Sequence, residues 1–170
     1  MQCQPLVEAC WMISVLFSSS HEYLRPGQLV GALLTDDFGT PLPAGLEHAA
    51  PDFGPIGALL DDLDERYKGT TAVGPGTHAH LFMIGVEKSA TSRGIAHRLI
   101  ECCVDNASRR GYTSAVTEAT GNISQHIFRK LGFKELHTAR YKEFSFNGAQ
   151  VFSSIQGVDG TILMERNLAD

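Results

Sequence analysis

The spacing of hydrophobic and polar positions changes along the chain and predicts a mixture of strands and helices. Residues 78–86 predict a strand, in which residues 81–86 are an apolar run of strand length, bounded by Gly-Pro-Gly at residues 74–76 and by the polar residues 87–93. Apolar positions then take helical spacing, and Gly111 stands where a helix C-cap belongs. The helical stripe consists of Ile95, Leu99, Ile100, Cys103, Val104 and Ala107. A strand, a glycine-bearing loop and a helix therefore follow one another here.

The N-terminal half predicts three more elements. Residues 4–24 have apolar positions near helical spacing, so we expect a helix there, with any first strand short, confined to residues 1–4, or absent. Residues 28–34 predict a strand that ends at a turn, and residues 41–55 are irregular and rich in Pro, Gly and Ala. Residues 56–68 predict a helix. Its apolar face contains Leu59, Leu60 and Leu63, and its solvent face contains Asp61, Asp62, Asp64 and Glu65.

The C-terminal part predicts strands around one further helix. Residues 112–119 and 161–167 have strand patterns, and residues 134–146 and 150–155 flank Asn147-Gly148, the strongest short indication of a β-hairpin. Asn122 and Ser124 open the helix that follows residue 120. Both side chains are suited to capping that helix or to contacting a ligand, and capping is the better interpretation for Asn122.

The loop before Ile95 carries a chemical indication of its own. The N–H groups of a first helical turn have no intrahelical acceptor, and the helix dipole adds partial positive charge. A strand, a loop with Gly94 and a helix start are therefore suited to a phosphate-type ligand, and Arg93 could add a formal charge. An ordinary strand-to-helix connection explains the same residues equally well.

Two blocks resemble the GCN5-related N-acetyltransferase (GNAT) superfamily. Residues 91–96, Thr-Ser-Arg-Gly-Ile-Ala, are similar to the family's Gln/Arg-x-x-Gly-x-Gly/Ala phosphate loop, with Thr91 at the Gln/Arg position. Residues 120–133 end in Leu-Gly-Phe, like a late helix of the family. A tyrosine that protonates the departing thiolate often precedes that final phenylalanine by five residues, but Phe128 stands there and cannot donate a proton. Weaker likenesses, in His80-Leu81 and in residues 141–168, are to the arylalkylamine N-acetyltransferase branch.

The resemblance implies an α/β (α+β) three-layer sandwich formed by a single domain over residues 1–170. Its mixed, mostly antiparallel central sheet would be splayed at the acetyl-CoA site, with helices on both faces. In the family a bulge opens the splayed strand, and Gly85 is suited to such a bulge. Acetyl-CoA is the implied co-substrate. Its expected binding residues are Ile84, Gly85, Val86, Thr91, Ser92, Arg93, Gly94, Ile95, Ala96, Ser124 and Phe128.

Three residues are candidates for removing a proton from an amine. His80 is one because the near-neutral pKa of histidine suits this role, although a buried, hydrogen-bonded strand histidine is an equal alternative. Glu118 is suited to be a base or an ammonium anchor, because a carboxylate on a central strand is costly unless it is paired or faces a cleft. Glu22 resembles a catalytic glutamate of insect-type members. An exposed carboxylate at a helix end is the simpler interpretation of Glu22.

Composition limits the partners. The net charge is −5 and no Lys/Arg run is present, so nucleic acid is not an expected partner. The four cysteines have no metal or disulfide spacing, which predicts reduced thiols and a cytoplasmic setting. His78 and His80 share a strand face but lack a third ligand, so we expect no metal, and the apolar residues 9–17 are too few to span a membrane.

The expected function is transfer of an acetyl group from acetyl-CoA to a primary amine by direct attack in a ternary complex. The acceptor could be a small molecule or a peptide amine, and a homodimer is compatible with the sequence. The alternative is a catalytically weak acyl-CoA-binding sensor of the same fold, because Thr91 and Phe128 depart from the family pattern.

Overall fold

The computed structural model describes residues 3–8, 11–17, 28–41 and 53–169, the first two ranges by their backbone alone. Seven strands form one sheet in the order β1-β2-β3-β4-β5-β7-β6. The β4–β5 pair is parallel and every other pair is antiparallel. The strands are β1 (Cys3–Glu8), β2 (Trp11–Phe17), β3 (Leu29–Asp37), β4 (His78–Val86), β5 (Ser114–Ala119), β6 (Lys134–Arg140) and β7 (Gly160–Asn167).

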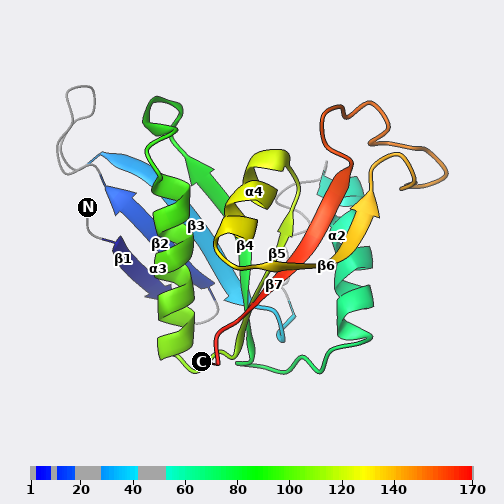
Figure 1. Cartoon of the computed structure of the whole chain (residues 1–170). Helices are drawn as coiled ribbons and strands as arrows, with labels where there is room; N and C mark the ends of the chain where they lie inside the picture. The colour runs from blue at the N-terminus through cyan, green and yellow to red at the C-terminus, as the bar shows by residue number, and fades with distance from the viewer. Residues whose placement is uncertain (1–2, 9–10, 18–27, 42–52, 170) are drawn as a thin grey trace.

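Helices cover both faces of the sheet, as expected for a three-layer sandwich (Figure 1). The helices α3 (Ile95–Arg109) and α4 (Asn122–Lys130) pack on one face and share a hydrophobic core with it. Helix α2 (Gly54–Lys68) packs on the other face, where Leu59, Leu63 and Tyr67 enter a second core. A short 3₁₀ turn, Lys88–Ala90, connects β4 to the loop before α3. Among the helices of the described ranges, none has both the length and the apolarity that crossing a bilayer requires.

The central elements agree with the sequence pattern. Strand β4 has the predicted bounds, and the buried residues of α3 are the six that form its predicted apolar stripe. Strand β3 instead continues beyond the predicted end of its strand to Asp37, and the chain turns at Phe38. The Asn147-Gly148 turn forms with positive φ at both residues, but it closes only a bridge between Phe146 and Ala149. Of residues 134–146, only β6 (Lys134–Arg140) is a strand, and it pairs with β7, so the long hairpin predicted with residues 150–155 is wrong.

The helix predicted over residues 4–24 is wrong for the residues that the structure describes there. Strands β1 and β2 occupy residues 3–8 and 11–17 and pair antiparallel, with Glu8 opposite Trp11. The fold therefore has its first strand and does not begin with the expected helix. The expectation of reduced cysteines is also wrong for Cys102, which is disulfide-bonded, whereas Cys103 is a free and buried thiol.

The sheet opens between β4 and β5. Their parallel pairing covers only His78–His80 against residues 114–116, after which no further pairs join them in the described chain. Where the strands diverge, the Thr117 hydroxyl donates to the carbonyl of Leu81 at 2.9 Å. On the other side of β4, Leu34 lies opposite Met83 and Thr35 opposite Leu81, so β4 carries an additional residue at Phe82. The bulge is therefore at Phe82 and not at Gly85.

Candidate active site

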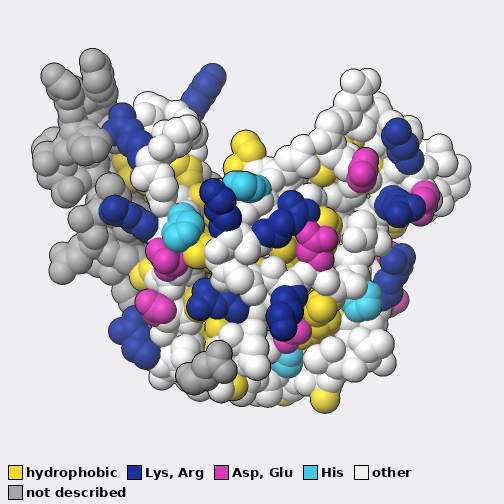
Figure 2. Space-filling model, in the orientation of Figure 1, with side chains coloured by type: hydrophobic (Ala, Val, Ile, Leu, Met, Phe, Trp, Pro, Cys, Tyr) yellow, Lys and Arg dark blue, Asp and Glu magenta, His cyan; other side chains and the backbone are white. Residues whose placement is uncertain are grey.

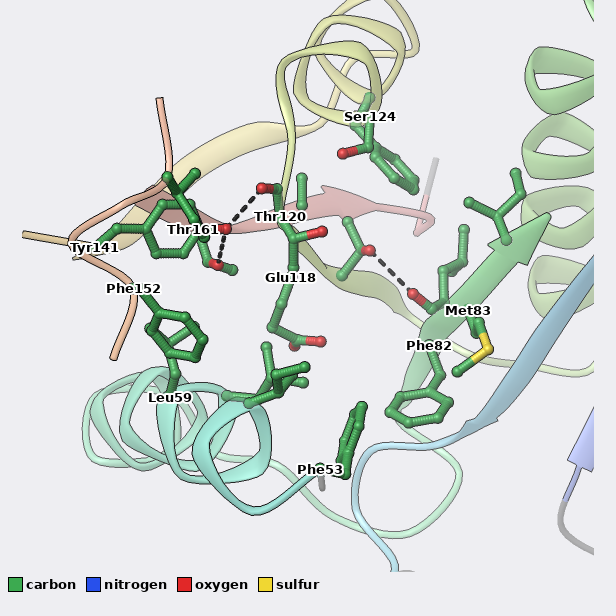
Figure 3. Close-up of a pocket in the computed structure, with 18 residues that line it drawn as sticks. Phe53, Leu59, Phe82, Met83, Glu118, Thr120, Ser124, Tyr141, Phe152 and Thr161 are labelled. Atoms are coloured by element: carbon green, nitrogen blue, oxygen red, sulfur yellow. Dashed lines mark hydrogen bonds between the residues drawn. The ribbon is translucent and has the colours of Figure 1, made fainter. Parts of the chain in front are cut away.

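A cavity of about 540 Å³ lies where the sheet opens, between β4, β5 and the N-terminal half of α2 (Figure 3). Its wall is mostly apolar and rich in aromatic rings. Glu118 is the carboxylate that lines it, and its side chain points from β5 toward the space between α2 and Phe82. The main apolar lining residues are Phe53, Ile56, Leu59, Leu60, Phe82, Met83, Phe128, Tyr141, Phe152 and Ile155.

The carboxylate of Glu118 is held by a histidine between two acidic side chains. His80 Nε2 lies 2.7 Å from Glu118 Oε2, and His80 Nδ1 lies 2.8 Å from Asp36 Oδ1. The side chains of Glu118 and His80 are 3% and 8% exposed. The strand register accounts for the contact between His80 and Asp36, because Asp36 lies opposite His80 in the β3–β4 ladder. The structure therefore brings together two predicted catalytic residues and adds Asp36.

This arrangement keeps the imidazole charged. Burial acts to lower the pKa of His80, but the Coulombic attraction of Glu118 and the contacts with both carboxylates raise that pKa to about 10. The same ion pair, together with hydrogen bonding, outweighs burial at Glu118 and lowers its pKa. At neutral pH the pair is an imidazolium and a carboxylate. The premise that His80 has a near-neutral pKa, on which its role as a base rested, does not agree with this geometry.

Asp64 of α2 also faces this group. The sequence pattern placed it on the solvent face of its helix, which is wrong: its side chain is 21% exposed and interacts with Glu118. Burial and the negative charge of Glu118 raise the pKa of Asp64 to about 8. The helical spacing could have indicated this inward position of Asp64, because Asp64 follows Leu60 by four residues and so lies on the same helix face.

The loop before α3 has the shape of an anion site. Ser92 and Gly94 have φ of 61° and 72°, and Gly94 is the N-cap of α3, which has no side-chain cap. A Cβ on Gly94 would meet no atom within 4 Å, so its surroundings are open. Arg93 Nη1 is buried and has no hydrogen-bond partner among the described residues. The remaining predicted loop residues are Thr91, exposed, and Ile95 and Ala96, which begin α3 with Ile95 buried in the core.

The other predicted cofactor residues lie along the same opening. Ile84 lines the cavity, and Gly85 and Val86 follow it toward the loop before α3. Figure 1 places the C-terminal end of β4 and the start of α3 at one edge of the sheet, with the start of α4 and the loop after β6. The surface is hollowed at this edge, between the loop before α3 and the loop after β6 (Figure 2).

The start of α4 contributes Ser124 and Phe128 to the cavity wall. The Ser124 hydroxyl donates to the carbonyl of Gly121 at 2.8 Å and accepts from its N–H, so Ser124 caps α4. The expectation that Asn122 is the cap is wrong, because its amide donates to the carbonyl of Gly157. Phe128 is buried and packs edge-on against Phe133.

Tyr141 is a cavity residue that sequence reasoning missed as part of the site. Its hydroxyl lies 2.6 Å from the Thr120 carbonyl and 3.0 Å from Thr161 Oγ1 (Figure 3). Donation to the carbonyl holds the ring against the cavity. No motif in the sequence connects Tyr141 to Glu118, because the two residues reach the same cavity only through the pairing of β5 with β7 and the turn that follows β6.

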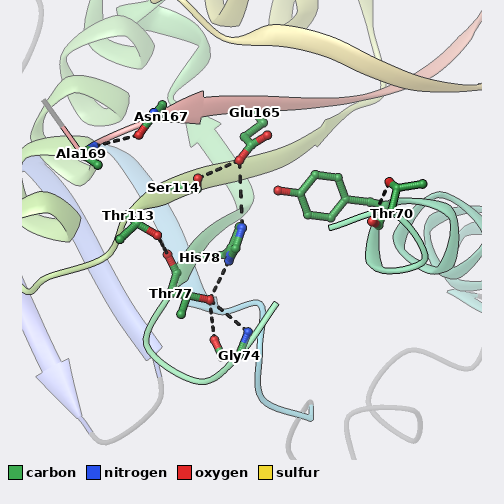
Figure 4. A network of polar contacts seen from close by, with 10 residues as sticks. Thr70, Gly74, Thr77, His78, Thr113, Ser114, Glu165, Asn167 and Ala169 are labelled. Atoms are coloured by element: carbon green, nitrogen blue, oxygen red, sulfur yellow. Dashed lines mark hydrogen bonds and ion pairs between the residues drawn. The ribbon is translucent and has the colours of Figure 1, made fainter. Parts of the chain in front are cut away.

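His78 belongs to a separate polar network (Figure 4). Its Nδ1 lies 2.6 Å from the Thr77 hydroxyl, its Nε2 lies 4.0 Å from Glu165, and Ser114 donates to Glu165 at 2.7 Å. Burial lowers the pKa of His78 despite the nearby carboxylates. In the described ranges no group of three or more His, Cys, Asp or Glu side chains is arranged to hold a metal. Glu22, the third predicted catalytic residue, lies outside the described residues.

Comparison with solved structures supports the fold. The chain is 20% identical to arylalkylamine N-acetyltransferase 2 from Aedes aegypti, with a TM-score of 0.69, covering 93% of this chain and 73% of that one. It is 18% identical to an agmatine N-acetyltransferase mutant, with a TM-score of 0.67 and coverage of 93% and 76%. It is 19% identical to the polyamine N-acetyltransferase of Drosophila melanogaster, with a TM-score of 0.63 and coverage of 92% and 74%.

A match to a protein-family model identifies the family of the chain. The model described as "Acetyltransferase (GNAT) domain" matches residues 59–151, more than half of the chain. The matched region runs from α2 through β6 and includes the open edge of β4, the loop before α3 and Glu118. The chain therefore belongs to the GNAT acetyltransferase family.

Proposed function

We propose that the protein transfers an acetyl group from acetyl-CoA to a primary amine by direct attack in a ternary complex. The observation that carries the proposal is the position of Glu118. It is a charged carboxylate at the wall of an apolar cavity, and that cavity opens at the gap between β4 and β5. A buried carboxylate is costly unless it has a partner, and here His80 supplies one while the cavity leaves room for a cationic group.

The residues beside the gap fit acetyl-CoA. Main-chain groups of Ile84, Gly85 and Val86, on the side of β4 that β5 leaves, would pair with the amides of an extended ligand. The first-turn N–H groups of α3 and the guanidinium of Arg93, whose Nη1 has no partner among the described residues, would bind its phosphates. Bound acetyl-CoA supplies a thioester, which is the electrophile of the reaction.

The chain itself positions the amine and receives its proton. Glu118 accepts hydrogen bonds from the ammonium and orients its nitrogen toward the gap. Its lowered pKa makes Glu118 a strong anchor and a weak base, so it takes a proton from the ammonium in only a small fraction of the complexes. The neutral amine formed in this way has the lone pair that attacks the thioester carbon, and the C–S bond then breaks to release coenzyme A as a thiolate. His80 is a positioning residue that keeps Glu118 ionised. A free N–H of β4 at the gap is suited to stabilise negative charge on the acyl oxygen.

The cavity wall favours an acceptor with an apolar body. Five aromatic side chains line the cavity, and Glu118 is the acidic residue in its lining. Apolar walls with one polar anchor recognise ligands that have a hydrophobic body and a single charged end. An arylalkylamine matches this pattern. Agmatine, the substrate named for a structural neighbour, carries a second cation that the cavity lining does not pair.

Release of coenzyme A thiol tests this proposal. With acetyl-CoA and 2-phenylethylamine, we expect thiol release that depends on the amine and is at least about tenfold faster than with agmatine at equal concentration, because the apolar wall contributes binding. Acetyl-CoA without amine is the control. Binding of acetyl-CoA with no amine-dependent thiol release, over a panel of aryl, alkyl and peptide amines, would contradict the enzyme assignment. It would favour the alternative function, an acyl-CoA-binding sensor, which the departure at Phe128 also fits.

Replacing His80 with glutamine checks its positioning role. The substitution removes the imidazolium that lowers the pKa of Glu118, so that pKa rises. Because the amine needs ionised Glu118, the acid limb of the pH profile of kcat/KM should move to higher pH by about one unit or more. Activity at high pH should recover in part. An acid limb that stays in place would show that His80 does not control the ionisation of Glu118.

A further inference from the structure

On the side of Glu118 that faces α2, a second carboxylate lies beyond the cavity lining, that of Asp64. Two buried carboxylate oxygens, Asp64 Oδ1 and Glu118 Oε1, have no hydrogen-bond donor among the described residues. Their side chains interact with each other, Asp64 from α2 and Glu118 from β5. An ionised carboxylate only accepts hydrogen bonds, so two ionised partners could not hydrogen-bond each other.

A single proton resolves this contact. When Asp64 is protonated, its O–H donates to Glu118 Oε1, and both unpartnered oxygens become satisfied. The other oxygen of Glu118 remains on His80 Nε2 at 2.7 Å. Leaving both carboxylates ionised would cost the repulsion of two like charges in a largely dry site. The same logic explains paired carboxylates elsewhere in enzymes, where one of the two holds a proton.

We propose that Asp64 is a positioning residue that shares one proton with Glu118 and so sets the charge of the amine site at a single negative charge in neutral solution. The proposal rests on the proposed function for its role in amine binding, but not for the shared proton itself. Burial and the charge of Glu118 both favour the protonated form of Asp64.

The charged groups around Asp64 act on its pKa in opposite directions. Burial and the charge of Glu118 raise that pKa, whereas the positive charges of His80 and Lys68 lower it, and the raising effects are the larger. His80, with Asp36 on its far side, attracts negative charge on Glu118 and Asp64, and Lys68 Nζ lies 3.8 Å from Asp64 Oδ2. Lys68 is 44% exposed, so solvent screens its attraction. Counting Asp36, His80, Glu118 and protonated Asp64, the cluster carries one net negative charge. One substrate ammonium neutralises it.

The shared proton gives the amine site a pH response. Above the pKa of Asp64 the cluster gains a second negative charge, so an ammonium should bind more tightly as pH rises through this range. In wild-type protein the KM for 2-phenylethylamine should fall by about fivefold or more between pH 7 and pH 9. Asp64→Asn keeps an N–H donor toward Glu118 but cannot ionise, and its KM should lack this fall.

Carboxyl ¹³C NMR tests the shared proton without any assay of activity. In protein labelled at the side-chain carboxyl of aspartate, one resonance should titrate with a midpoint near pH 8 and disappear in Asp64→Asn. In Glu118→Gln the midpoint should fall by about one unit or more, because the neighbouring negative charge is gone. Asp61→Asn, an exposed position of the same helix, is the matched control and should leave the titration of the Asp64 resonance unchanged.

The outcomes separate the two proposals. An Asp64 resonance that titrates below pH 5 would overturn the shared proton, and it would assign Asp64 to an ordinary ion pair with Lys68. A midpoint near pH 8 in a protein that acetylates no amine would keep the shared proton and contradict the proposed function. A normal midpoint that does not respond to Glu118→Gln would also overturn the inference.

Discussion

Replacing Glu118 with glutamine is expected to lower kcat/KM for the amine by about 10²-fold or more, while acetyl-CoA binding stays within about threefold. Glutamine has nearly the same shape, but it is neutral and cannot take the proton that the ammonium loses. Its amide would also face the imidazolium of His80, which then lacks its closer carboxylate. The loss of activity should therefore affect mainly the binding and reaction of the amine. Steady-state kinetics with each substrate varied, together with calorimetric titration of acetyl-CoA, measure both parts.

The matched control for this substitution is Glu165→Gln. Glu165 lies near a buried histidine too, His78, but on a different strand and outside the cavity lining. It should leave kcat/KM within about threefold, because it does not touch the amine site. If Glu118→Gln keeps its activity within a few-fold of wild type, Glu118 is not the ammonium anchor and the proposed roles have to be reassigned.

Replacing Gly94 with glutamate is expected to weaken acetyl-CoA binding by about 10²-fold or more, equal to about 2.7 kcal/mol. The substitution places a negative charge at the N-terminus of α3, where the phosphates would bind, and forces a side chain into a left-handed conformation with φ of 72°. Calorimetric titration measures the change directly.

Gly111→Glu controls for backbone strain and added charge. Gly111 follows α3 at its opposite end, has φ of 89°, and has open space around its Cβ position, as Gly94 does. It should carry a similar conformational cost without a phosphate nearby, so acetyl-CoA affinity should not change. An equal loss of acetyl-CoA affinity in both variants would attribute the effect to general destabilisation. Unchanged affinity in both variants would show that the loop is not part of the cofactor site.

The elements that the sequence predicted well are those in which the hydrophobic residues recur with one dominant period. The stripe of α3 and the bounds of β4 follow from helical and strand spacing interrupted by glycine and proline. Residues 11–17 lack such a period, because Trp-Met-Ile-Ser-Val-Leu-Phe is apolar almost throughout. In the structure these residues form the strand β2, which lies between β1 and β3. A continuous apolar run fits helix and strand alike, and the two residues before it include no glycine or asparagine to indicate a hairpin.

The candidate site could be predicted only in pieces. His80 and Glu118 were identifiable as unusual polar residues on central strands, but their contact depends on β4 pairing with β5 in parallel across 38 residues of sequence. Asp36 reads as part of a turn, and only the bulge-shifted register of β3 against β4 brings it opposite His80. Such registers are set by tertiary packing, which residue spacing does not encode.

The short pairing of β4 with β5 has a consequence for the mechanics of the sheet. Three residue pairs at one end form a seam between a four-stranded plate, β1 to β4, and a three-stranded plate, β5, β7 and β6. Beyond the seam, no strand pairs join β4 to β5 in the part of the chain that the structure describes. An extended ligand lying in that opening would cross-link the plates through main-chain hydrogen bonds and act as the missing strand between them. In this protein, recognition of the ligand and completion of the sheet would be a single event, with part of the binding energy going into the rigidity of the fold.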